Sequence, residues 1–81
     1  MENNQTQNNF QPNVRDLQLL RLKKIHRTQT WLSKQINENS AYVSQYFSGV
    51  GHFDLEDKIE RRISREERII KERIEKQNQL A

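Results

Sequence analysis

Apolar residues recur at helical spacing through the first third of the chain, beginning directly after a polar start. In VRDLQLLRLKKIH, residues 14–26, most of them fall on one face at 3.6 residues per turn. Asn13 is a suitable N-cap for this segment. The pattern predicts a first helix with a buried face made of Val14, Leu17, Leu22 and Ile25, broadened by Leu19 and Leu20.

Two shorter helices are predicted next. One opens at Thr28 or Gln29 and runs to Ile36, and Asn37 then tolerates the left-handed conformation that a tight turn after a helix needs. The other starts behind Asn39 or Ser40 as N-cap and ends at a glycine. The inner face of the first should be Leu32 and Ile36, that of the second Val43, Tyr46 and Phe47, and the closing glycine is Gly49.

A fourth helix is predicted behind Asp54, with apolar residues repeating every four positions at Leu55, Ile59 and Ile63. The repeat resumes at residues 70 and 74 after two glutamates. Ser64 and Glu67 could therefore form a capping box that starts a separate helix.

The amino-terminal stretch MENNQTQNNFQP holds a single bulky apolar residue among amides, too little to offset the entropy of ordering it. We expect an all-α protein, a compact bundle of four to five short helices containing a helix-turn-helix. Its parts are a disordered arm at 1–12, a helix-turn-helix domain at 13–63 and a charged helix at 64–81.

The spacing inside residues 28–49 fits a helix-turn-helix, in which the second helix crosses the first at a small side chain. Ser33 is that small residue, and Asn37 occupies the turn four positions later. Val43 is the β-branched residue that packs the second helix on the first, and Tyr46 faces the same core.

These residues resemble the lambda-repressor-like, or Cro and XRE, class of helix-turn-helix proteins over roughly residues 14–63. The matching string is Thr28-Gln29, Leu32-Ser33, Val43-Ser44 and Phe47-Ser48-Gly49. Glu38 departs from it, because the family buries an aliphatic residue just after the turn. The run from Val43 to Gly49, followed by Asp54 and an acidic helix, is also similar to the amino-terminal domain of transposition ATPases typified by the B protein of phage Mu. No G-x-x-x-x-G-K-[ST] phosphate loop is present, so the chain is either one domain of such a protein or a small free-standing regulator.

The composition narrows the function. With 81 residues, the chain has room for one small domain. It has no cysteine, which excludes thiol chemistry. Because no catalytic set or cofactor motif is visible either, we expect no enzyme and no cofactor. No apolar run approaches the roughly 18 residues of a membrane span, and we expect a cytoplasmic protein without a membrane partner. Up to residue 50 there are six basic and three acidic residues, and afterwards eight of each. The basic excess therefore belongs to the helix-turn-helix part, as expected for a polyanion partner.

The resemblance implies which residues would meet double-stranded DNA. Ser40, Ala41, Ser44 and Gln45 would face the major groove, flanked by Tyr42, and the amide of Gln45 can pair bidentately with adenine. Gln29, Asn39 and Ser48 would hold the phosphate backbone, with added charge from Arg27 and Lys34.

The implied function is sequence-specific DNA binding, in a transcriptional regulator of a phage or mobile element or in a transposition protein. Besides DNA, the partner could be a second copy of the chain in a homodimer, or the other components of a larger regulatory or transposition complex. The alternative is an adaptor domain that uses the same helices to dock a protein. Metal binding is disfavoured, since His26 and His52 lie far apart without further ligands at suitable spacing.

Overall fold

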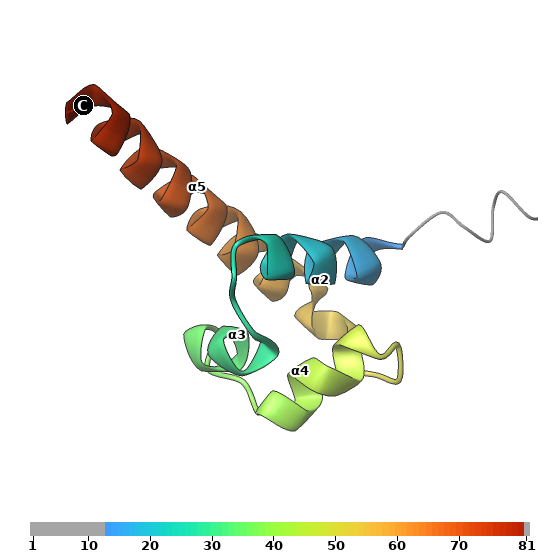
Figure 1. The fold of residues 1–81 in the computed structure, drawn as a ribbon. Coiled ribbons are helices and arrows are strands. Elements are labelled where there is room, and N and C mark those ends of the chain that lie inside the picture. The colour runs from blue at the N-terminus through green and yellow to red at the C-terminus, as the bar shows by residue number, and fades with distance from the viewer. Residues whose placement is uncertain (1–12, 81) are drawn as a thin grey trace, which may run out of the picture.

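The structure, a computed structural model, describes residues 13–80, and within them it is built of helices without a strand. This confirms the all-α bundle. The predicted arm, residues 1–12, lies outside the described residues. In chain order the elements are α2 (Val14–Lys24), α3 (Gln29–Gln35), α4 (Ser40–Phe47), the 3-10 turn η1 (Phe53–Leu55) and α5 (Glu56–Leu80), as Figure 1 shows.

Side-chain caps start the first three of these helices. The side-chain oxygens of Asn13, Thr28 and Asn39 each accept a hydrogen bond from a backbone N–H in the first turn that follows, at 2.9, 3.0 and 2.8 Å. Each bond satisfies a donor that would otherwise have no partner inside the helix. Asn37, with φ 57°, and Gly49, with φ 77°, adopt the left-handed conformation expected for the turns after α3 and α4.

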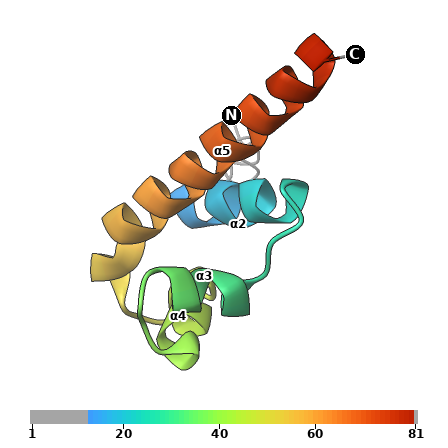
Figure 2. The same ribbon diagram turned by 90° about the vertical axis from the view of Figure 1, so that its left-hand side faces the viewer.

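One core holds the bundle together. It forms where α2, α3 and α4 pack around the first half of α5, and the predicted apolar faces of α3, α4 and the start of α5 all point into it (Figures 1 and 2). Its buried residues are Leu22, Leu32, Ile36, Val43, Tyr46, Phe47, Leu55, Ile59 and Ile63. Ser33 is buried as well, which lets α3 and α4 approach each other closely.

The predicted buried face of α2 was partly wrong. Leu22 is buried, but Val14 and Leu17 remain 47% and 45% exposed, and Gln18 takes the core position with 1% exposure. Gln18 can be buried because both ends of its amide are bonded. Its oxygen accepts from the hydroxyl of Tyr46, and its nitrogen donates to the Glu60 carboxylate at 3.0 Å. A buried amide with its partners in place costs little, so α2 is turned toward this polar group.

The capping-box alternative at Ser64 was also wrong, because α5 runs unbroken for 25 residues from Glu56 to Leu80. Ser64 Oγ donates to Glu60 one turn earlier, at 3.1 Å, and does not cap a new helix. The two glutamates that interrupt the apolar repeat are bonded to arginines of other segments. The far end of α5 then extends beyond the rest of the bundle (Figures 1 and 2).

Candidate nucleic-acid interface

The outer side of α4 is a polar, uncharged surface. Val43, Tyr46 and Phe47 turn inward on this helix, so residues about half a turn away must face outward. Five residues on this outward side are exposed, and their spacing of three and four places them on one face. We call this set the α4 face: Ser40, Ala41, Ser44, Gln45 and Ser48.

Behind the α4 face, α3 crosses α4 and holds it in place. The two helices are joined by the short turn at residues 36–39, where the N–H of Glu38 donates to the carbonyl of Ser33 at 2.9 Å. Leu32 and Val43 are both fully buried at this crossing. The face is therefore carried by a helix whose orientation is fixed by packing.

Tyr42 lies at the edge of the α4 face, where its ring contacts another side chain of the protein. Its ring stacks on His52 from the loop before α5, with 4.2 Å between ring centroids and 15° between planes. His52 itself adopts a left-handed backbone conformation, with φ 60°. The stack leaves Tyr42 44% exposed and orders the loop beside α4.

The three residues expected at the phosphate backbone occupy different places. Asn39 is exposed at the start of α4, where its oxygen is used by the cap, so only its amide N–H groups are left to donate to a ligand. Ser48 is exposed at the other end of α4. Gln29 is half-buried at the first residue of α3 and does not belong to the α4 face.

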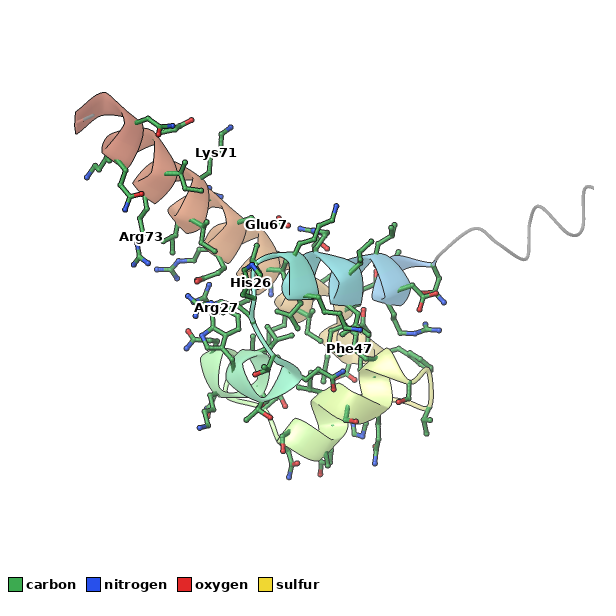
Figure 3. All side chains as sticks on the ribbon, in the orientation of Figure 1. His26, Arg27, Phe47, Glu67, Lys71 and Arg73 are labelled. Carbon is green, nitrogen blue, oxygen red and sulfur yellow. The ribbon has the colours of Figure 1, made fainter. Side chains whose placement is uncertain are left out.

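Arg21 and Arg27, two of the basic residues before residue 50, bind glutamates of α5. Arg21 donates to both oxygens of Glu67, at 2.9 and 3.0 Å, and to both oxygens of Glu60, at 2.9 and 3.0 Å. Arg27 donates to Glu66 at 2.7 and 3.1 Å. Figure 3 shows Arg27 and Glu67 at the junction between α2, α3 and α5. Arg27, expected to add charge at a DNA site, is thus paired with Glu66, and its contribution to DNA binding stays a prediction.

These ion pairs change the acidity of the groups that form them. Hydrogen bonds from Gln18 and Arg21 hold the pKa of Glu60 below its usual value, against the opposing effect of burial. For Glu66, burial alone would raise the pKa, but Arg27 and Arg62 outweigh it and the pKa is lowered. The bidentate bonds to Glu67, together with Glu60, raise the pKa of Arg21. Glu60, Glu66 and Arg21 therefore stay charged at neutral pH.

Four basic residues of α5 lie on the side of the helix that adjoins the end of α3. They follow one another at spacings of three and four, which places them in a row. We call this row the α5 cationic strip: Lys58, Arg61, Arg62 and Arg65. Together with Gln35 and Ile36 at the end of α3 they line an open groove of about 220 Å³. Counting charges along the sequence missed the strip, because eight basic and eight acidic residues cancel there, but the spacing at 58, 61, 62 and 65 was a usable signal.

Two members of the strip are anchored. Lys58 Nζ contacts Glu38 in the turn before α4 at 2.6 Å. Arg62 donates to Gln35 at 2.8 Å and to Glu66 at 3.2 Å, and its guanidinium lies 4.8 Å from the ring centroid of Trp31. Arg61 and Arg65 are exposed. The strip is thus attached to the turn that leads into α4.

Comparison with family models, curated proteins and solved structures found no match for this chain. The resemblance to lambda-repressor-like and Mu B-like domains stays a prediction, carried by the spacing of residues 28–49. Among residues 13–80, no three histidine or acidic side chains gather as a metal site would need. None of the described helices has the length and apolar character required to cross a membrane.

Proposed function

We propose that this protein binds double-stranded DNA and reads its sequence by placing the α4 face in the major groove. The observation that carries the proposal is the α4 face itself, five exposed small or amide side chains on a helix fixed from behind by α3. The major groove admits an α-helix, and small side chains let the helix backbone approach the base edges. A solvated surface helix in a chain with 31% charged residues would ordinarily carry charge, and α4 carries none.

Within this proposal Gln45 is the main reader of sequence. Its side chain is exposed near the middle of the α4 face and can donate to and accept from adenine N7 and N6 at once, a contact worth about 1–3 kcal/mol of discrimination. Ser40, Ala41 and Ser44 let the helix come close and tolerate several bases. Tyr42 flanks the groove.

Backbone contacts would come from Gln29, Asn39 and Ser48. Side chains of this kind fix the position of a protein on the duplex without selecting sequence. Such a domain suits a transcriptional regulator of a phage or mobile element, or the DNA-binding part of a transposition protein. We propose these as its biological settings on the strength of the resemblance in residues 28–49.

The competing proposal, a protein-docking adaptor, has one observation in its favour. Val14, Leu17 and Leu20 form an apolar row on the outer side of α2, and they are 47%, 45% and 51% exposed. Exposed apolar residues that gather on one surface often mark protein contacts. This row lies on α2 and not on α4, so a protein partner bound there would not use the α4 face.

Two matched substitutions test the proposal. Gln45→Ala should weaken the preference for one sequence and leave non-specific affinity nearly unchanged, because it removes a base contact. Gln29→Ala should weaken all duplexes alike, because it removes a backbone contact. The measurement is selection from a randomised duplex pool with the parent protein and each variant, followed by titration of the selected and a scrambled duplex.

A parent protein that binds no duplex even at low salt would favour the adaptor. Recovery of the parent motif by Gln45→Ala, at equal enrichment, would show that α4 does not read the bases.

A further inference from the structure

The folded contacts show which charged residues of α5 have ion-pair partners, and the sequence alone does not show this. Glu60, Glu66 and Glu67 lie against Arg21 and Arg27, which come from α2 and the loop that follows it. These three glutamates of α5 are therefore paired with arginines from other segments. In the same two turns, Lys58 and Arg62 of the α5 cationic strip are paired with Glu38 and Glu66, and Arg61 and Arg65 are exposed.

The strip lies next to one end of the α4 face. Lys58 contacts Glu38, and the residue after Glu38 is Asn39, the N-cap of α4. Arg62 reaches Gln35 at the end of α3. A duplex that met the first turn of α4 would therefore have the strip close beside it.

The α4 face lacks the charge that DNA binding requires. Phosphate neutralisation by Lys and Arg supplies essentially all non-specific affinity for DNA, and α4 has neither residue. Arg21 and Arg27, two of the basic residues of the preceding segments, are bound to glutamates. Within the helix-turn-helix, residues 28–49, Lys34 is the one basic residue, and it is exposed. Further cations must come from outside the motif, and the strip is joined directly to the turn before α4.

The chemistry of the strip suits phosphodiester groups. Three of its four members are arginines, whose planar guanidinium pairs bidentately with phosphate. From residue 58 to residue 65 a helix rises roughly 10 Å, and one DNA strand carries a charge about every 3.4 Å along its axis. The row can thus follow two or three consecutive phosphates.

We propose that the α5 cationic strip binds the phosphate backbone of the duplex beside the base pairs that α4 reads, and supplies most of the salt-dependent affinity. The inference rests on the proposed function of the α4 face. It assigns the charged part of the interface to a helix outside the helix-turn-helix.

The test replaces the two exposed members of the strip. Arg61→Gln/Arg65→Gln removes two charges and keeps good helix-forming residues at both positions. If each guanidinium neutralises one phosphate, the slope of log K against log salt should become shallower by about 1.8, and affinity for any duplex should fall roughly 10- to 100-fold at 0.1 M salt. The selected motif should stay the same.

The matched control is Lys71→Gln/Arg73→Gln, which removes the same charge from the part of α5 that extends beyond the bundle, where Figure 3 labels both residues. Circular dichroism should show parent helix content for both variants. The control should keep the parent slope, because its positions are remote from α4.

Each failure has a distinct signature. An unchanged slope and affinity in Arg61→Gln/Arg65→Gln, with the parent still binding DNA, overturns the strip alone and directs attention to an acidic protein partner for it. Equal loss in the strip variant and the control also overturns it, because only total charge would then matter. A parent that binds no duplex overturns both proposals, whereas loss of slope with no effect of Gln45→Ala supports the strip and contradicts reading by α4.

Discussion

A buried chain of two hydrogen bonds connects α4 to α2 and α5. The hydroxyl of Tyr46 donates to Gln18, whose nitrogen donates to Glu60, and both Tyr46 and Gln18 are buried. Burial and the nearby charge of Glu56 raise the pKa of Tyr46 to about 12, so its hydroxyl keeps its proton and remains a donor. The orientation of the α4 face therefore depends on a polar contact inside the core.

Replacing this hydroxyl should destabilise the protein. Tyr46→Phe leaves the oxygen of Gln18 buried without a donor, which should lower the free energy of unfolding by about 1–3 kcal/mol. Urea denaturation followed by circular dichroism measures the change. Tyr42→Phe is the matched control, because its ring is exposed and its stack on His52 does not need the hydroxyl, so it should stay within about 0.5 kcal/mol of the parent. Equal effects of the two substitutions would show that the Tyr46 hydroxyl contributes nothing specific.

At the scale of the element, the helices of the bundle were predictable because local rules determine them. Caps at Asn13, Thr28 or its neighbour and Asn39, and left-handed turns at Asn37 and Gly49, follow from single residue types. The buried face of α2 was not predictable. Hydrophobicity favoured Leu17, whereas the fold buries Gln18 because Tyr46 and Glu60, distant in sequence, satisfy its amide.

The continuity of α5 was missed for a related reason. Glu66 and Glu67 interrupt the apolar repeat, and nothing local shows that Arg27 and Arg21 will bind them. Once paired, a glutamate can occupy a buried position, and the side chain of Glu66 is only 6% exposed.

These carboxylates should make the docking of α5 sensitive to acid. The pKa values of Glu60 and Glu66 are lowered in the folded protein, so both bind protons more readily when unfolded. The stability they contribute is then fully present above the ordinary glutamate value of 4.5 and is lost as pH falls through the lowered folded values. We expect the urea midpoint to be nearly constant from pH 7 to pH 5 and to fall steeply below pH 4.

Glu66→Gln is the variant that checks this cause. It should be less stable than the parent at pH 7, because Arg27 and Arg62 lose their charged partner, and its urea midpoint should fall less between pH 5 and pH 3. An acid dependence as steep as that of the parent would assign the effect to other carboxylates.

For the whole molecule, the distribution of basic residues along the sequence differs from the distribution of unpaired positive charge on the folded surface. The basic excess lies before residue 50 in the sequence, but Arg21 and Arg27 of that part are paired with glutamates of α5, and α5 itself carries exposed arginines at positions 61 and 65. Four residues of the α4 face were predicted from the resemblance, and helical spacing agrees, because it places them away from the buried Val43. The α5 cationic strip could not be found by counting charge, since only the folded contacts show which acids are already neutralised.

The molecule thus presents two different surfaces next to each other, an uncharged α4 face and a cationic row on α5. A third surface, the apolar row of Val14, Leu17 and Leu20 on α2, belongs to the competing adaptor function. The three surfaces come from different helices, so a measurement that distinguishes helices can decide between the two functions.

The most direct test is an NMR titration of the ¹⁵N-labelled chain with a short duplex of mixed sequence at low salt, following backbone amides. We predict the largest shifts at residues 40–48, with a second group at 58–65, and little change at 14–20. Shifts confined to 14–20, or no shifts at all, would contradict the claim that α4 carries a DNA-binding surface.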